Sequence, residues 1–451
     1  MNREYDMQPA KPQFPKFLFC VSVFFTVCGL VLTFIWPILL RYILQSKLVL
    51  TPNSETHDPW KKTPFSVPLD FYLFNWTNPE DIYNKNVKPK FQQVGPYRYW
   101  EVYEKSNVTW NNNGTVTFRH RKFWHFNYTE PNGDLQARIN TINPVILSAA
   151  HTVRSWNYWV RKGFSVTLSG IASGINITQT IDEMLFKGFS DPLLDMTSSI
   201  PFLAGRLPPY DKFGFFYKRN GSVNNDGVFN MGTGINSTFG KLYNWNYWAQ
   251  TPYYEGKCGK IHGSAGDFFP RSPDNSVISL FLPSLCRSVT LKLVGQGEVE
   301  NITGYTYALE ARTLDNGTIY PENKCYCNGE CLPSGVLNIS SCSYDAPFFI
   351  SLPHFHNADP YYTSLVDGLK PENEKHDFYI TLEPNTNIVL EADAKLQINM
   401  LLQPIPGISI FEKVPKAFFP LMWSQQHVKI PASDASKLKW LLIMPVILSS
   451  T

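Results

Sequence analysis

The longest unbroken apolar stretch lies near the start of the chain. Residues 17–40, FLFCVSVFFTVCGLVLTFIWPILL, contain no charged residue and lie between Lys16 and Arg41. A helix of this length extends roughly 36 Å, enough to cross a hydrocarbon core of about 30 Å. A cleaved signal peptide is the alternative, but its apolar region usually has only about 7–15 residues and ends in small ones. The pattern predicts a transmembrane helix at 17–40 after a polar cytosolic tail at 1–16.

A second apolar run begins at Trp440 and continues to Thr451, directly after Lys437 and Lys439. Its twelve residues would make a helix of roughly 18 Å, which is too short to cross a bilayer. The run is either the start of a second transmembrane helix or a segment that lies in the membrane interface. We expect the start of a second helix at 440–451, which leaves 41–439 as one ectodomain.

Beyond the first apolar stretch the pattern changes to the period of two that is typical of strands. Phe65, Val67, Leu69 and Phe71 alternate with other residues, and the polar segment 77–79 then predicts a turn. Further along, Gly95-Pro96 predicts a turn before an aromatic-rich strand. The segment Asn-Asn-Asn-Gly at 111–114 separates two β-like runs, which predicts a hairpin. Short strands and loops are also expected from 205 onward.

Residues 143–203 follow a helical pattern instead. Asn143 is a good N-cap, Pro144 suits the first turn, and apolar residues recur at helical spacing to about Arg161. We expect a flexible apolar piece at 163–177. A capping-box pattern then follows at Thr180 to Glu183, and another short helix is expected near Pro192. The sequence therefore predicts a helical subregion inserted into a β-rich chain.

The composition supports a folded, β-rich protein and argues against a nucleic-acid partner. Hydrophobic residues make up 43% and charged residues 17% of the 451 positions. The net charge of +3 is small for this length, and there is no long basic run with interleaved aromatics. An aromatic content of 15% with 34 prolines is typical of many short elements joined by turns. Antiparallel β architecture is the expectation.

Glycosylation sequons indicate the side of the membrane on which the ectodomain lies. None precedes the first apolar stretch, and a dense set follows it, which predicts an extracellular or lumenal ectodomain. The sequon asparagines are Asn75, Asn107, Asn113, Asn127, Asn176, Asn220, Asn236, Asn301, Asn316 and Asn338.

Six cysteines lie between residues 258 and 342, and two more lie in the first apolar stretch. In an oxidising compartment an even number predicts three disulfides, although six cysteines allow fifteen pairings. A zinc site around Cys325, Cys327 and Cys331 is the alternative, but paired C-x-x-C knuckles are lacking. The six are Cys258, Cys286, Cys325, Cys327, Cys331 and Cys342.

Enzyme signatures are lacking in this sequence. It has no H-E-x-x-H, no G-x-S-x-G and no phosphate-binding glycine loop, and Gly295-Gln-Gly297 lacks the third glycine of a dinucleotide turn. His354 and His356 are spaced so that they could share a metal, but ordinary hydrogen bonding is the favoured interpretation. We therefore expect neither an enzyme nor a cofactor.

Several long stretches resemble the class B scavenger receptor family, which includes the platelet fatty-acid translocase, a lysosomal integral membrane protein and croquemort. The resemblance covers nearly the whole chain. It rests most clearly on FNWTNPEDI (74–82), VGPYRYWE (94–101), GDFFPRSP (266–273), FFISLPHFHNADP (348–360), DGLKPENEKHDFYITLEPNTN (367–387) and LQINMLLQP (396–404).

The resemblance implies a mixed α+β ectodomain attached to the membrane by a transmembrane helix at each end, the second one truncated here. It implies an antiparallel β-barrel core, an apical helical bundle at about 143–203 and a hydrophobic tunnel that passes lipid to the bilayer. It also implies the disulfide pairs of the region 258–342. In this sequence they are Cys258 with Cys325, Cys286 with Cys342, and Cys327 with Cys331.

By this resemblance the protein binds lipids, lipoprotein-like particles or apoptotic debris. It acts at the plasma, endosomal or lysosomal membrane, and it can form a homo-oligomer. The alternative is a receptor for a protein cargo in the endolysosomal pathway. Because 163–186 contains no lysine or arginine, a neutral lipid such as a sterol or carotenoid is favoured over fatty acids, phospholipids and polyanionic particles. A bundle that only packs on the barrel is the other interpretation of this stretch. The candidate entrance residues are Arg154, Trp156, Arg161, Lys162, Phe164, Ile171 and Ile175.

Overall fold

A computed structural model describes residues 16–47, 49–129, 133–171, 174–198, 210–271 and 275–450. The chain divides into a large unit at 49–430 and a terminal unit made of 1–48 with 431–451. Within the terminal unit, helices α1 (Lys16–Lys47) and α7 (Ala432–Ser450) contact each other.

The structure bears only in part on the predicted membrane segments. In the described part of the chain, no helix is both long enough and apolar enough to cross a membrane. The predicted transmembrane segments at 17–40 and from 440 are therefore not confirmed. The predicted tail at 1–16 lies outside the described residues except for Lys16, and so does Thr451 at the end of the second segment.

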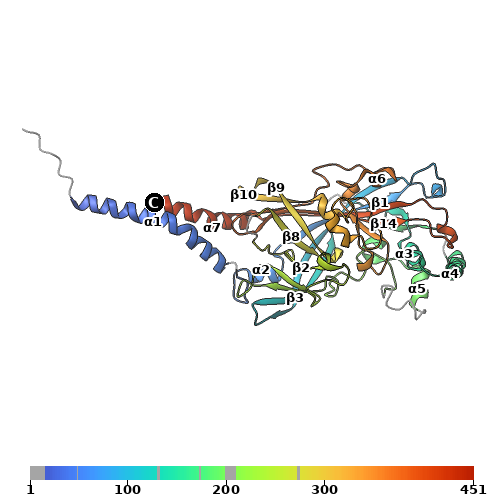
Figure 1. The fold of residues 1–451 in the computed structure, drawn as a ribbon, viewed down its shortest axis with the longest axis horizontal. Helices are drawn as coiled ribbons and strands as arrows, with labels where there is room; N and C mark the ends of the chain where they lie inside the picture. The colour runs from blue at the N-terminus through green and yellow to red at the C-terminus, as the bar shows by residue number, and fades with distance from the viewer. Residues whose placement is uncertain are drawn as a thin grey trace, which may run out of the picture. The chain divides into compact units, whose positions relative to one another are not determined.

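One antiparallel sheet dominates the large unit (Figure 1). Its strands follow the order β7-β6-β3-β2-β1-β15-β14-β13-β10-β9-β8. Outside this order, β12 pairs with β14, and β11 pairs with β12. The strands are β1 (Val67–Trp76), β2 (Phe91–Trp110), β3 (Thr115–Phe126), β6 (Val228–Gly232), β7 (Leu242–Trp245), β8 (Val277–Leu282), β9 (Arg287–Val299), β10 (Ile302–Leu309), β11 (Leu337–Asn338), β12 (Phe348–Ser351), β13 (Tyr379–Leu382), β14 (Val389–Leu402) and β15 (Ala417–Lys429).

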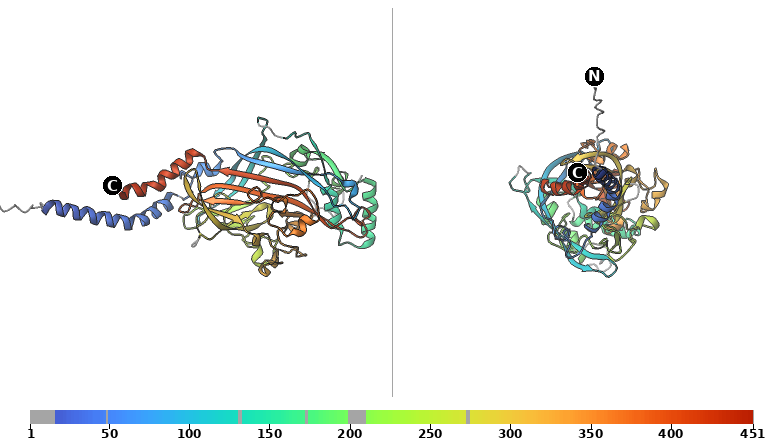
Figure 2. Two further views of the ribbon diagram at one scale, coloured as in Figure 1. Left: turned by 90° about the horizontal axis from the view of Figure 1, so that it is seen from above. Right: turned by 90° about the vertical axis from the view of Figure 1, so that its left-hand side faces the viewer.

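The sheet curls until its two outer strands are joined by a short segment. Leu242 of β7 donates its N–H to the Gly263 carbonyl, and Ser264 exchanges backbone hydrogen bonds with Ser279 and Phe281 of β8. These contacts give a nearly closed barrel, which removes most of the exposed strand edge. The end-on view in Figure 2 shows the strands curving around a common interior. The expectation of an antiparallel barrel core is confirmed.

Local signals in the sequence explain some of the strand boundaries. β1 ends at the predicted polar turn, and the predicted hairpin at 111–114 joins β2 to β3. The predicted turn at Gly95-Pro96 is wrong, because both residues lie inside β2. There they form a bulge opposite Tyr72 of β1. A side chain at Gly95 would approach the Phe71 carbonyl oxygen to 2.7 Å, so the bulge requires glycine.

The helical subregion lies at one end of the barrel (Figure 1) and contains more breaks than its sequence pattern predicts. Asn143 caps α3 (Pro144–Val153) as expected, since its Oδ1 accepts the N–H groups of Val145 and Ile146. The single helix expected to run to Arg161 is wrong, because α3 ends at Val153 and α4 (Tyr158–Ile171) starts anew. Asn157 begins α4 by accepting the Trp159 N–H.

The piece expected to be flexible at 163–177 is wrong as well, because α4 continues to Ile171 and β5 (Asn176–Thr180) pairs with β4 (Arg138–Ile142). The predicted capping box is confirmed. Glu183 accepts the Thr180 N–H while Thr180 accepts the Glu183 N–H, at the start of a π-helix at Glu183–Lys187. The short helix expected near Pro192 is α5 (Pro192–Ser198), and 199–203 lie outside the described residues. The remaining helices are α2 (His57–Lys61) and α6 (Pro360–Ser364).

Three disulfides join the cysteines of 258–342. They are Cys258–Cys325, Cys286–Cys342 and Cys327–Cys331, the pairs that the family resemblance implies. The first two link segments separated by 67 and 56 residues, so they close long loops beside β8 and β9.

Candidate functional site

The candidate entrance residues lie in and around α3 and α4, but they differ in how far they reach the surface. Trp156, Phe164 and Ile171 are partly buried and pack against the largest apolar cluster of the barrel. Ile175 is fully enclosed in that cluster, and its carbonyl accepts the Asn143 N–H. Ile175 therefore lies deeper in the molecule than Trp156, Phe164 and Ile171, which are partly exposed.

The three cationic candidates are all engaged by neighbouring groups. Arg154 pairs with Asp345 at 3.1 Å, and Lys162 pairs with Glu412 at 2.9 Å. Arg161 donates from Nη1 to the Arg154 carbonyl. Two of the three cations are therefore paired with carboxylates, whereas Arg161 is held by a neutral carbonyl and keeps its charge.

The exposed face of α4 is apolar, which the sequence pattern alone did not reveal. Trp159 and Val166 are 77% and 75% exposed. Because they are seven residues apart, they lie on the same face of the helix. Gly163 and Gly170 fall on the same face, with open space where a side chain would be. We call Trp159, Gly163, Val166 and Gly170 the α4 face. Two large apolar side chains exposed on one helical face make this face a candidate interaction surface.

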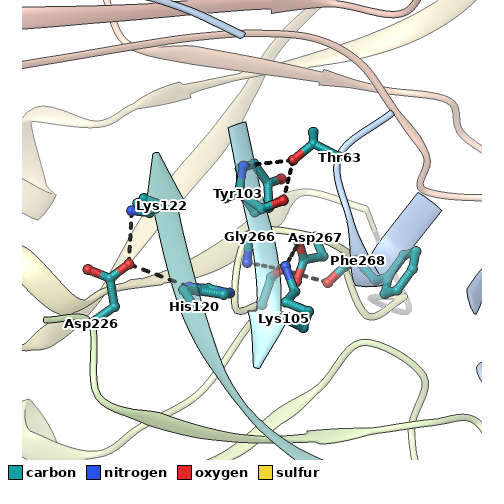
Figure 3. Close-up of polar contacts among 10 residues, drawn as sticks. Thr63, Tyr103, Lys105, His120, Lys122, Asp226, Gly266, Asp267 and Phe268 are labelled. Atoms are coloured by element: carbon teal, nitrogen blue, oxygen red, sulfur yellow. Dashed lines mark hydrogen bonds and ion pairs between the residues drawn. The ribbon is translucent and has the colours of Figure 1, made fainter. Parts of the chain in front are cut away.

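The barrel interior contrasts with this surface, because it contains a row of charged side chains (Figure 3). Lys105 lies directly opposite His120 across β2 and β3, and Tyr103 lies opposite Lys122. Residues two apart on a strand share a face, so all four side chains project to the buried side of the sheet. We call Tyr103, Lys105, His120 and Lys122 the interior polar row.

Lys105 holds the segment that closes the barrel. Its ammonium is completely buried and pairs with Asp267 at 2.8 Å, on the loop that follows the bridging residue Ser264. The ammonium also lies 4.6 Å from the Tyr103 ring centre and 5.6 Å from that of Phe118, within cation–π range. Burial lowers the pKa of Lys105, and the charge of Asp267 opposes this effect.

A second anion, Asp226, completes the row. It pairs with Lys122 at 2.9 Å and lies 3.5 Å from His120 Nδ1. Burial raises the pKa of Asp226, but the charges and hydrogen bonds of Lys122 and His120 together outweigh burial, so the net pKa is lowered. Burial, reinforced by Lys105, lowers the pKa of His120. The row thus contains one enclosed ion pair, Lys105 with Asp267, and a second pair, Lys122 with Asp226, whose side chains are still 31% and 22% exposed.

Sequence reasoning missed this row, although a signal was present. The second of the two β-like runs beside 111–114 is TVTFRHRKFWHF, in which apolar and basic residues are interleaved. Its basic residues point to both faces, however. Arg121 pairs with Glu104 on the outer, partly exposed face, whereas His120 and Lys122 point inward. Only the partners Asp226 and Asp267, distant in sequence, distinguish the inward residues.

The other predicted sites are placed individually. His354 and His356 do not share the hydrogen-bond partner of Nε2: that of His354 contacts Gln93, whereas that of His356 contacts Asp377. The sequon asparagines differ in exposure. Asn107, Asn113, Asn220, Asn236 and Asn301 are exposed, Asn75, Asn176 and Asn338 are partly buried, and Asn127 and Asn316 are buried.

Comparison with known proteins shows the family to which this chain belongs. The family model described as the CD36 family matches residues 20–451. The chain belongs to the CD36 family. It is 37% identical over 407 residues to "Protein peste" of Drosophila melanogaster, covering 89% of this chain and 73% of that protein.

Two mammalian members of the CD36 family are also similar. "Lysosome membrane protein 2" of Homo sapiens is 31% identical, over 90% of this chain and 84% of its own length. "Scavenger receptor class B member 1" of Bos taurus is 29% identical, over 90% and 79%. The resemblance to class B scavenger receptors is therefore confirmed.

Proposed function

We propose that this CD36 family protein is a scavenger-receptor-type membrane protein that binds lipids or lipid-bearing particles, apoptotic debris included, and passes lipid through its barrel to the membrane. The observation that carries the proposal is the exposed α4 face. It lies next to Trp156, Phe164 and Ile171, which pack against the largest apolar cluster. An amphiphile that left water at α4 would thus meet apolar side chains on its way inward.

A neutral lipid suits this entrance better than a polyanion. Arg154, Arg161 and Lys162 are each engaged, two of them by carboxylates, so an anionic ligand would have to displace existing partners. A sterol or carotenoid needs no such exchange. We therefore propose neutral lipid as the preferred cargo.

Membrane attachment is part of the same proposal. The uncharged stretch 17–40 lies within α1, and α7 extends from Ala432 through Trp440. We propose that these segments anchor the protein in the plasma membrane or an endosomal or lysosomal membrane, with 41–439 on the extracellular or lumenal side. The name "Lysosome membrane protein 2" for one relative supports a membrane location.

A protein-cargo receptor is the second candidate function. Trp159 favours it, because exposed tryptophans are enriched among the residues that dominate protein–protein binding. In this alternative the α4 face binds a partner protein, and the barrel interior carries no lipid.

Full-length protein purified from cells tests the proposal. Lipid extracted from it is analysed by mass spectrometry, and uptake of labelled sterol and labelled fatty acid is measured in expressing and untransfected cells. We expect co-purified lipid and sterol uptake above background. Purified protein without lipid, together with background uptake, contradicts transport. Under those conditions, a partner protein that co-purifies with this chain, and is lost when Trp159 is replaced, supports the alternative.

A further inference from the structure

A pocket on the flank of the barrel belongs neither to the α4 face nor to the interior polar row. It encloses about 650 Å³ between β1, β2, β14, β15 and the loop at 368–376. His354, His376, Asp393, Lys395 and Trp423 form its buried floor, whereas Gln92, Gln93 and the charged side chains at its rim are exposed. The lining residues are Tyr72, Phe91, Gln92, Gln93, His354, Gly368, Lys370, Glu372, Glu374, Lys375, His376, Asp393, Lys395, Trp423 and Gln425.

Hydrogen bonding fixes the orientation of the groups at one side of the floor. The indole N–H of Trp423 can only donate, so the Gln93 atom that it contacts at 2.7 Å is the acceptor Oε1. Nδ1 of His354 accepts the Lys370 N–H, so its Nε2 carries the proton and donates to the same Oε1. The Gln93 carbonyl is thereby fully used, and its NH₂ group is left to donate elsewhere.

His376 is oriented in the same way. Its Nδ1 accepts the Glu372 N–H at 2.9 Å, so Nε2 carries the proton of the neutral ring. Among the described residues this Nε2–H has no hydrogen-bond partner. On the opposite wall, Asp393 uses its oxygens on Lys395 at 2.7 Å and on the Gln425 amide at 2.9 Å. An ammonium has three N–H donors, so Lys395 keeps donors beyond this pair.

Apart from the carboxylates at the rim, the available groups in the pocket are therefore mainly donors. Those of His376, Gln93 and Lys395 face one cavity, while the acceptors of His354 and Asp393 are occupied. We propose that this pocket is a binding site for a phosphate-type oxyanion, either a free phosphate or the head group of a phospholipid. Such a group accepts several hydrogen bonds at once, and charge-assisted bonds of this kind are the stronger ones.

The rim of the pocket contains a cation that an anionic ligand would meet. Lys370 is exposed and its ammonium has no partner among the described side chains, whereas Lys375 is held by Glu372 at 2.6 Å. Lys370 thus provides a cation that can turn toward a bound oxyanion. Glu374 stands at the same rim and would exclude ligands that extend acidic groups past it.

Equilibrium dialysis of the full-length protein in detergent against labelled inorganic phosphate, at constant ionic strength, tests the site. We expect saturable binding. His376→Phe keeps a ring beside His354 but removes the donor, and should weaken binding about ten-fold. Lys370→Met, an exposed change that leaves the fold intact, should weaken it about three-fold. The matched control is Lys85→Met, which removes an exposed lysine outside the pocket and should change nothing.

A second arm separates the two sources of phosphate. Competition with the labelled phosphate by phosphatidic acid in detergent micelles, with diacylglycerol as the phosphate-free control, measures head-group binding by the same variants. Binding that depends on Lys370 in either arm supports the site and identifies its source. An absence of saturable binding in both arms overturns it, as does an equal loss with Lys85→Met. Sterol uptake unchanged by Lys370→Met shows that this site acts apart from the proposed transport.

Discussion

The α4 face and the interior polar row invert the usual distribution of polarity in a soluble domain. Trp159 and Val166 stand in solvent, whereas Lys105 and Lys122 point into the barrel. Leaving apolar side chains exposed forgoes stabilising burial, and enclosing charges costs desolvation. In our proposal the exposure at α4 serves binding. The enclosed Lys105, by contrast, holds the closing segment of the barrel through Asp267.

The largest expected effect follows from breaking the enclosed pair. Asp267→Leu leaves the Lys105 ammonium buried without its anion, so the free energy of unfolding should fall by about 3–5 kcal/mol. Replacing both, as Lys105→Met with Asp267→Leu, should recover most of this loss because no charge remains unpaired. Chemical denaturation of the full-length protein measures both variants. Equal destabilisation by the single and double changes would refute a role for the charge pair.

The second test asks whether buried imidazoles make the barrel sensitive to acid in a way that the α4 face is not. Burial lowers the pKa of His354 and of His376 to about 4, with neighbouring histidines adding to the effect. An unfolded histidine has a pKa of about 6.5. Below that pH the unfolded chain therefore binds protons that the folded barrel does not. The stabilisation is complete above about pH 6.5 and is lost as the pH falls toward 4.

We expect a loss of a few kcal/mol over that interval. The charge of Glu372 raises the pKa of both rings, whereas the charges of His356, Lys395 and Lys375 lower the pKa of His376. Thermal unfolding at a series of pH values gives the profile. His376→Phe should flatten it, whereas replacement of the exposed His427 should not. A profile that is flat for the unmodified protein argues against neutral buried rings.

The smallest expected effect on stability is at the α4 face. Val166→Ser changes an exposed side chain, so the free energy of unfolding should move by less than about 0.5 kcal/mol. Sterol uptake should nevertheless fall, because the apolar surface is interrupted. Val294→Ser on β9, where the side chain is also exposed, is the matched control. Uptake that falls equally in both variants would remove the distinction between α4 and the rest of the surface.

The sequence by itself determined the features that depend on neighbouring residues. Asn143 caps α3, Thr180 and Glu183 form their capping box, and 111–114 turns β2 into β3. In each case the interacting groups lie within a few positions, so local propensity decides the outcome. The same local view predicted a turn at Gly95 and missed the break before Asn157, because packing against β1 and the new cap at α4 override periodicity.

Only the tertiary structure decided which polar residues face inward and what they meet. Lys105 and Asp267 are separated by 162 positions, and Gln93 and Trp423, which orient the flank pocket, by 330. Their meeting depends on strand register, and a shift of one residue would send Lys105 to the outer face. Register is set by the whole barrel. The periodicity of the sequence therefore indicated a β-rich chain, while the position of its buried charges required the closed sheet.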